Sequence, residues 1–138
     1  AKDLKELLDY VNHPYLKACW DAGHGNMIDV SQEESLKILG DYVYALHIQD
    51  NDGNGDLHYA PYFGSLSLDS LMVGLKEIGY KGYFTFEATN IPVPSYKRKK
   101  CEKADKLIEV PVHIKKMAEK LLYEIGKYIL SEYDEFEE

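Results

Sequence analysis

The sequence of 138 residues predicts an α/β fold, and three observations favour this class. Apolar residues recur at helical spacing in four separate segments. Between these segments lie three short runs of apolar, aromatic and β-branched residues, which are typical of strands. Each strand-like run follows a helical segment, and connections of this length suit the right-handed crossovers that join parallel strands.

The first helix and the first strand are predicted near the amino terminus. The helix is indicated by four apolar residues at helical spacing, Leu4, Leu7, Leu8 and Val11. It ends before Pro14, because the residue preceding a proline avoids the α region. Residues 15–20 form a short apolar run that predicts a strand. Two glycines in residues 21–25 then predict a tight loop.

A second helix and a second strand follow. The helix begins at Ser31, which has capping-box spacing with Glu34, and it ends at Gly40, a residue type common after a last helical turn. Residues 42–48 are apolar on both alternating sets apart from His47. This pattern predicts a parallel strand that is covered on both faces.

A polar loop and a third helix come next. The loop at residues 49–59 is too long for a hairpin turn, and long ordered loops often carry function. Apolar residues at helical spacing predict a helix over residues 68–78, with Asp69 as its N-cap and Gly79 after its last turn. The connection between the second predicted strand and the third predicted helix therefore contains one long polar segment.

The last predicted strand spans residues 83–86, which are aromatic and β-branched, and it ends on Glu87. A long final helix is marked by Ile114, Met117, Leu121, Ile125 and Ile129. We expect the acidic tail at residues 132–138 to fray, and the basic run at residues 97–100 to form a solvated loop.

These elements predict one domain over residues 1–138. Three strands cannot close a barrel, and a complete eight-stranded (β/α)8 barrel needs roughly 250 residues. The order of elements matches the C-terminal three β/α units of such a barrel with a long closing helix. We therefore expect a partial (β/α)8 TIM barrel.

Composition narrows the classes of function. The formal net charge is −8, whereas surfaces that follow phosphate backbones concentrate Lys and Arg, so nucleic acid is a disfavoured partner. No apolar run approaches the roughly 18 residues that span a bilayer, and no signal segment is recognisable. We expect a cytoplasmic protein without membrane contact, in which Cys19 and Cys101 are free thiols.

Acidic residues and histidines stand where the predicted strands end. Asp21 and His24 follow the first strand, His47 lies near the end of the second, and Glu87 ends the third. The loop after the second strand adds Asp50, Asp52, Asp56 and His58. Active sites of barrels lie at the carboxyl ends of the strands, where successive loops point at a common centre. Oxygen and imidazole ligands without cysteine suit Mn²⁺, Mg²⁺, Co²⁺ or Zn²⁺ in an open catalytic site.

Each of these residues also has a simpler interpretation. Asp21 could be a turn residue, and His47 alone could be a hydrogen-bonded core histidine. Glu87 is harder to explain without a metal, because a buried unpaired carboxylate costs several kcal/mol. Asp56 and His58 suit additional metal ligands and loop-ordering hydrogen bonds equally well, and both interpretations stay open.

Four stretches carry a resemblance to a known family, namely residues 20–24, 46–51, 56–64 and 79–87. Their order and spacing resemble the xylose isomerase-like barrels, which include sugar and sugar-phosphate isomerases and epimerases together with endonuclease IV. One departure is the stretch Pro61-Tyr62-Phe63-Gly64, because family members commonly have Pro-Gly-x-Gly there. This departure from the family pattern implies an altered loop on the substrate side.

The resemblance implies a role for each candidate residue. Asp21, His47 and Glu87 correspond to three of the four metal ligands in epimerase members, and the fourth, a Glu of the fifth strand, has no counterpart here. The implied metal is Mn²⁺ first, with Mg²⁺, Co²⁺ or Zn²⁺ as alternatives. Glu87 would also be one of two glutamates that move a proton beside a carbonyl through a metal-stabilised enediolate. His24 would bind substrate oxygens, and no organic cofactor is implied.

Three hypotheses follow from these observations. The first is a divalent-metal sugar or sugar-phosphate isomerase or epimerase that is incomplete as an isolated chain. The second is an endonuclease IV-like zinc phosphodiesterase acting on abasic DNA, in which Asp56 and His58 complete a multi-zinc cluster with Asp21, His24, His47 and Glu87. The third is a non-catalytic half-barrel or partner subunit. Because an open parallel sheet exposes unpaired edges, we expect self-association or complementation by the missing N-terminal half-barrel.

Overall fold

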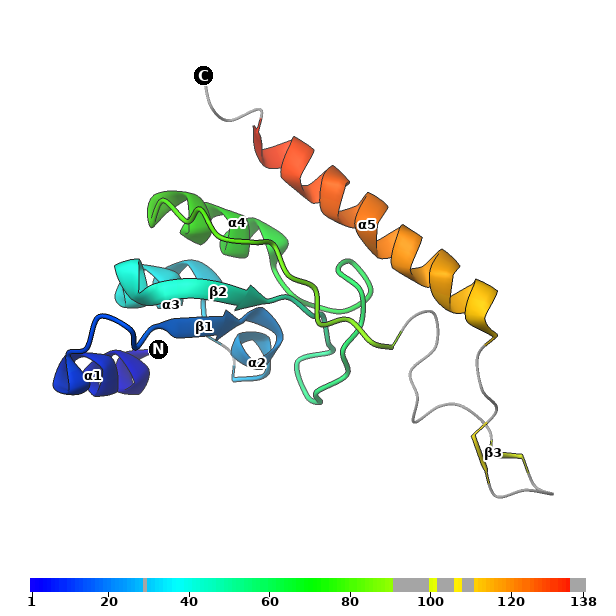
Figure 1. Ribbon diagram of the computed structural model, residues 1–138, viewed down its shortest axis with the longest axis horizontal. Helices are drawn as coiled ribbons and strands as arrows, with labels where there is room; N and C mark the ends of the chain where they lie inside the picture. Colours follow the sequence, from blue (N-terminus) through cyan, green and yellow to red (C-terminus); the bar gives the residue numbers. More distant parts are fainter. Residues whose placement is uncertain (29, 91–99, 102–105, 108–110, 135–138) are drawn as a thin grey trace.

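The computed structural model describes residues 1–28, 30–90, 100–101, 106–107 and 111–134. The α/β class is confirmed, since two parallel strands alternate with helices along the chain (Figure 1). The elements are α1 (Lys2–Val11), β1 (Ala18–Asp21), α2 (Ala22–Met27), α3 (Gln32–Leu39), the 3₁₀ turn η1 (Gly40–Tyr42), β2 (Val43–His47), α4 (Leu68–Glu77), β3 (Lys100–Cys101), β4 (Lys106–Leu107) and α5 (Val112–Asp134).

The main sheet is formed by β1 and β2, which pair in parallel. Asp21 and His47, the last residues of the two strands, are paired in register. The register shifts near the start of the strands, where Ala18 pairs with Val43 but the next residue pairs with Ala45. The two strands therefore deliver their last side chains to the same edge of the sheet.

The third predicted strand is present only as one parallel bridge between Ile48 and Phe86. The amide of Ile48 donates to the carbonyl of Thr85 at 2.9 Å, and the amide of Glu87 donates to the carbonyl of Ile48 at 2.9 Å. The prediction of a strand over residues 83–86 was thus too long. Its carboxyl end nevertheless lies beside the end of β2, as the barrel interpretation requires.

One face of the sheet packs on helices. Leu46 and Ile48 are buried in a core that includes Leu36 of α3 and Leu71 of α4. Figure 1 shows these two helices on the same side of the strands. The expectation that β2 is covered on both faces was wrong for this chain, because Tyr44 is 73% exposed and Ala45 is also exposed.

The first helix and strand agree with the sequence-based prediction in kind. Helix α1 ends at Val11, and Asn12 follows it in the left-handed region with φ 43°. Strand β1 begins at Ala18, three residues later than predicted. The segment 21–25 is not a loop, because α2 begins directly after Asp21.

The glycines of α2 explain why that helix was missed. A Cβ on Gly23 would lie 2.1 Å from Cδ of Gln49, and a Cβ on Gly25 would lie 2.8 Å from Cζ2 of Trp20. These glycines therefore allow close packing against buried side chains. Glycine was interpreted as a turn signal, although its small size was the reason for its presence.

Caps account for the ends of α3 and α4. The Ser31 side chain accepts a hydrogen bond from the amide of Glu34, as predicted, and Gly40 follows α3 with φ 51°. The N-cap of α4 is Ser67 and not Asp69, since the Ser67 side chain accepts from the amide of Ser70. The Asp69 carboxylate instead accepts a hydrogen bond from the Tyr133 hydroxyl.

The final helix confirms the long helical pattern. In α5, Ile129 is fully buried, and a Cβ on Gly126 would lie 2.9 Å from the ring of Phe86. The helix runs to Asp134, so residues 132–134 are helical where fraying was expected, and residues 135–138 lie outside the described residues. None of the described helices combines the length and apolarity needed to cross a membrane.

A short antiparallel pair, β3 and β4, was not predicted. It includes Lys100, the last residue of the basic run, whereas residues 97–99 lie outside the described residues. Cys19 is a free, exposed thiol, as expected. The side chain of Cys101 is outside the described part of the chain.

Candidate metal centre

Asp21, His47 and Glu87 come together at the carboxyl ends of the strands. Each offers one ligand atom, and these atoms all lie within 4.8 Å of one another. Nδ1 of His47 lies 3.3 Å from Oε2 of Glu87 and 3.9 Å from Oδ2 of Asp21. The structure thus assembles the three residues that were singled out from their positions at strand ends.

The backbone explains why these three side chains meet. Asp21 and His47 end two parallel strands in register, so their side chains project from the same edge. Glu87 joins them because its amide continues the parallel ladder onto Ile48. The helical start of α2 fixes Asp21 further, since its Oδ1 accepts from the amide of His24 at 2.9 Å.

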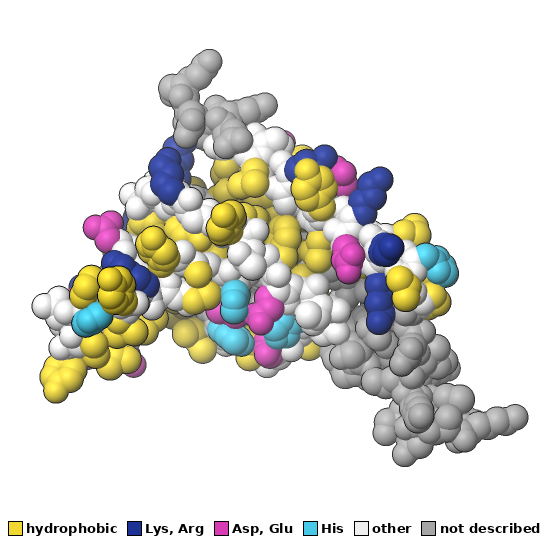
Figure 2. All heavy atoms as spheres, in the orientation of Figure 1, with side chains coloured by type: hydrophobic (Ala, Val, Ile, Leu, Met, Phe, Trp, Pro, Cys, Tyr) yellow, Lys and Arg dark blue, Asp and Glu magenta, His cyan; other side chains and the backbone are white. Residues whose placement is uncertain are grey.

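The centre is open on one side. The Asp21 side chain is 14% exposed, whereas those of His47 and Glu87 are 46% and 39% exposed. Figure 2 shows histidine and acidic side chains gathered at one place on the face in view. A ligand can therefore reach the group from solvent.

His24 lies between this group and a second cluster. Its Nδ1 is 3.2 Å from Oδ2 of Asp21, and its Nε2 is 3.5 Å from Oδ1 of Asp56. The same Asp56 oxygen lies 3.1 Å from Nε2 of His58. Within the described ranges, the ligand atoms of Asp21, His47 and Glu87 lie close enough together to share one ion, whereas those of His24, Asp56 and His58 do not form such a group.

His58 is tied to the backbone of Glu87. Its Nδ1 lies 2.7 Å from the Glu87 carbonyl oxygen, and because a carbonyl only accepts, Nδ1 carries the proton. Burial lowers the pKa of His58, but the hydrogen bond to Glu87 and the charge of Asp56 outweigh burial and raise the pKa above its ordinary value. His58 thus links the loop at residues 49–59 to the third strand-like segment.

Asp56 responds to the same contacts. Burial raises the pKa of this carboxyl, but His58 and His24 outweigh burial, so its pKa lies below the ordinary value. The carboxylate therefore acts as the shared acceptor of the second cluster.

Asp50 and Asp52 order the loop and do not join the metal group. The buried Asp50 carboxylate accepts from the amides of Asn51, Gly64 and Leu66 at 2.8, 2.9 and 2.9 Å. The exposed Asp52 accepts from the amides of Asn54 and Gly55. Their positions after a strand suggested chemistry, but their hydrogen bonds are structural.

Two buried amide side chains beside the centre were missed. Gln49 donates through Nε2 to Oδ1 of Asp56 at 2.8 Å. Asn51 donates to the carbonyl of Gly23 at 2.8 Å and accepts from the Asn26 side chain at 2.9 Å. Both lie within four residues of His47 in the sequence. Polar residues that directly follow an apolar strand were the signal that could have revealed them.

The departure from Pro-Gly-x-Gly has a visible geometry. Tyr62 stands where the family pattern has glycine, and it adopts φ 74°, a region that favours glycine. Its ring lies 6.2 Å from the ring of Tyr128 in α5. The altered loop therefore contacts the final helix through an aromatic pair.

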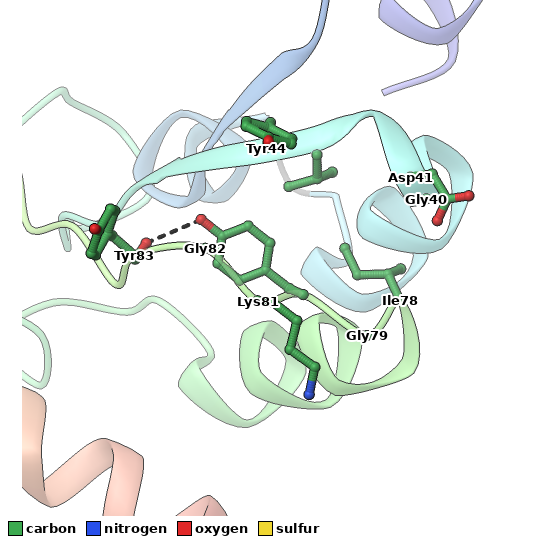
Figure 3. Close-up of a pocket in the computed structure, with 10 residues that line it drawn as sticks. Gly40, Asp41, Tyr44, Ile78, Gly79, Lys81, Gly82 and Tyr83 are labelled. Atoms are coloured by element: carbon green, nitrogen blue, oxygen red, sulfur yellow. Dashed lines mark hydrogen bonds between the residues drawn. The ribbon is translucent and has the colours of Figure 1, made fainter.

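A separate cavity of about 580 Å³ lies at the opposite end of the strands, between the start of β2 and residues 78–83 (Figure 3). Tyr44 and Tyr83 help to line it, and the Tyr80 hydroxyl donates to the Tyr83 carbonyl at 3.1 Å. This cavity separates the amino-terminal part of the third predicted strand from β2. It contains none of the candidate ligands.

Comparisons with solved structures support the barrel fold. The structure is similar to D-allulose 3-epimerase from Methylomonas sp., with a TM-score of 0.55 and 26% identity, covering 64% of this chain and 29% of the other. It is also similar to a D-tagatose 3-epimerase-like protein, with a TM-score of 0.58 and 23% identity, covering 95% of this chain and 42% of the other.

Sequence comparisons point to the same group of proteins. Over 49 residues, 36% of this chain, the sequence is 47% identical to fructoselysine 3-epimerase from Escherichia coli O157:H7. Over 92 residues, it is 30% identical to the uncharacterized protein MJ1311 from Methanocaldococcus jannaschii. These matches cover 18% and 31% of the two relatives, so the chain spans less than half of the proteins it resembles. Because residues 1–110 match the family profile, the chain belongs to the xylose isomerase-like TIM barrel family.

Proposed function

We propose that this chain supplies the cation-binding side of a sugar or sugar-phosphate isomerase or epimerase active site. The observation that carries the proposal is the meeting of Asp21, His47 and Glu87, with ligand atoms within 4.8 Å, at the carboxyl ends of the strands. Barrel enzymes place their active sites at this end. Similarity to proteins named as sugar epimerases supports the class of reaction.

The donor set suits a divalent cation. Two carboxylates and one imidazole match the preferences of Mn²⁺, which we propose first, and also accommodate Mg²⁺, Co²⁺ or Zn²⁺. The half-exposed side chains of His47 and Glu87 leave one side of the group accessible to a substrate. A bound cation would supply Lewis-acid stabilisation of negative charge that develops on a substrate oxygen.

The protein side chains would perform the remaining steps. Glu87 would accept or return a proton at a carbon beside a carbonyl, and the position of its carboxylate at the open side of the centre supports this role. His24 lies within 3.2 Å of Asp21 and is 58% exposed, so it can donate hydrogen bonds to substrate oxygens. A second acid or base is required for isomerisation, and we propose that it comes from the missing N-terminal half-barrel.

Substitution of Glu87 tests the proposal. Glu87→Gln should weaken the affinity of the 138-residue chain for Mn²⁺ or Co²⁺ by about 10–100-fold or more. Loss of a residue that only supports a metal ligand typically costs this much affinity, and loss of the ligand itself costs no less. Isothermal titration measures the affinity. Glu77→Gln is a matched control, because Glu77 pairs with Lys37 on the helical side.

The expected control result is unchanged affinity for Glu77→Gln. In a protein complemented by the missing half-barrel, Glu87→Gln should also abolish interconversion of aldose and ketose or of epimers. Equal cation affinity in the wild type and Glu87→Gln would reject the proposed centre, and unchanged turnover would reject the acid–base role of Glu87.

A further inference from the structure

The Asp56 carboxylate is a second place where candidate ligands meet. Its Oδ1 lies 3.1 Å from Nε2 of His58 and 3.5 Å from Nε2 of His24. A carboxylate with two imidazoles is a donor set that zinc-like cations bind in many proteins. The chemistry alone would therefore allow a second cation beside the first.

Gln49 directs a proton donor at the same oxygen. Its Nε2 lies 2.8 Å from Oδ1 of Asp56. The orientation of the amide follows from both ends of the side chain, because a carboxylate only accepts, and Oε1 faces the Asn51 Nδ2 donor at 3.4 Å. The oxygen that faces both histidines is thus already hydrogen-bonded.

The Gln49 side chain has no room to turn away. It is fully buried, and a Cβ on Gly23 would lie 2.1 Å from its Cδ. Its neighbour Asn51 is also buried and is held by the Gly23 carbonyl. The N–H group therefore stays on Asp56, where its partial positive charge opposes a cation and occupies an acceptor position.

We propose that Gln49 is a positioning residue that restricts the centre to one cation by keeping Asp56 a hydrogen-bond acceptor. The inference rests on the proposed function, since it takes the first cation to lie at Asp21, His47 and Glu87. It assigns His24, Asp56 and His58 to a hydrogen-bonded cluster beside the cation. Gln49 thereby separates a one-cation centre from a multi-cation one.

The test is the number of cations bound by Gln49→Glu. This change replaces the amide donor with a carboxylate. Four ligands are then available, namely the new carboxylate at position 49, Asp56, His24 and His58. Titration of the 138-residue chain with Co²⁺, followed by elemental analysis and visible absorption, should give one ion in the wild type and two in Gln49→Glu. The double variant Gln49→Glu with Asp56→Asn should return to one ion.

A second variant, Asp56→Asn, provides a test if Gln49→Glu folds poorly. Asp56→Asn alone should keep one Co²⁺ with an unchanged absorption spectrum, because Asp56 is not a ligand of the first ion. Two ions in the wild type, one ion in folded Gln49→Glu, or loss of the ion in Asp56→Asn would each overturn the role of Gln49. If the wild type binds none, the proposed function fails, and gain of one ion in Gln49→Glu would still support the role of Gln49.

Discussion

Asp50 is a buried carboxylate whose hydrogen bonds hold the loop beside the candidate centre. Asp50→Ala would leave the amides of Asn51, Gly64 and Leu66 without their acceptor. The hydrogen bonds from Asn51 and Leu66 are buried, and each unsatisfied buried amide costs about 1–3 kcal/mol, so we expect a loss of about 2–6 kcal/mol in the free energy of unfolding. Urea denaturation measures this loss.

Asp52→Ala is the matched control for that experiment. Asp52 is in the same loop and also accepts two amides, but it is exposed, so water can replace its hydrogen bonds. We expect a loss below about 1 kcal/mol. Equal destabilisation by the two variants would contradict the structural role of Asp50.

His58 should make stability depend on pH in the absence of metal. Because its pKa is raised in the folded state, its contribution is fully present below the ordinary value of 6.5 and is lost as pH rises through the raised pKa. Thermal unfolding in a chelator should therefore show a larger drop in Tm between pH 6 and pH 9 for the wild type than for His58→Asn. Parallel profiles would show that His58 is not the group responsible.

The residues of the candidate centre differ in how well a sequence reveals them. Asp21, His47 and Glu87 could be predicted because parallel topology alone brings strand ends to one edge. The role of Gln49 could not be predicted, since the path of a polar loop brings its hydrogen-bond partner Asp56 beside it. The positions of strand ends identify the candidate ligands, whereas the supporting contacts depend on tertiary packing.

Among the elements, helix caps decide where α3 and α4 begin. Ser67→Ala should cost about 1 kcal/mol, because the amide of Ser70 loses its side-chain acceptor. Chemical denaturation of this variant can be compared with Asp69→Asn, which retains an acceptor for Tyr133. A larger loss in Asp69→Asn would restore Asp69 as the cap that the sequence had suggested.

The elements also show what sequence signals leave undetermined. The ends of α3 were predictable from Ser31 and Gly40, because both act within one helical turn. Helix α2 was not, since Gly23 and Gly25 are required by close tertiary contacts with the side chains of Gln49 and Trp20. The third strand was overestimated because composition cannot show that a cavity separates Tyr83 from β2.

At the scale of the whole molecule, the described residues leave one face of the parallel sheet uncovered. Tyr44 and Ala45 of β2 are exposed there, although parallel sheets are normally covered on both faces. We propose that this face associates with a second copy or with a complementary N-terminal half-barrel. Size-exclusion chromatography with light scattering should show an assembly larger than 15.8 kDa.

A pair of lysine substitutions identifies the associating face. Ala45→Lys places a charge on the open side of β2 and should reduce the assembled fraction. Val73→Lys places the same charge at an exposed position of α4 and should leave the assembled fraction unchanged. A compact monomer in the wild type would contradict association with a second copy. Equal loss in both variants would show that another surface is responsible.

The shift in pairing near Ala18 has a consequence for the ends of the strands. If the pairing of Ala18 with Val43 continued unbroken, Leu46 would stand opposite Asp21. Leu46 is needed in the apolar core, and His47 would then lie one step beyond its counterpart. The extra residue in β2 shifts the register by one position. The strand can therefore bury Leu46 and still bring the imidazole of His47 opposite the carboxylate of Asp21.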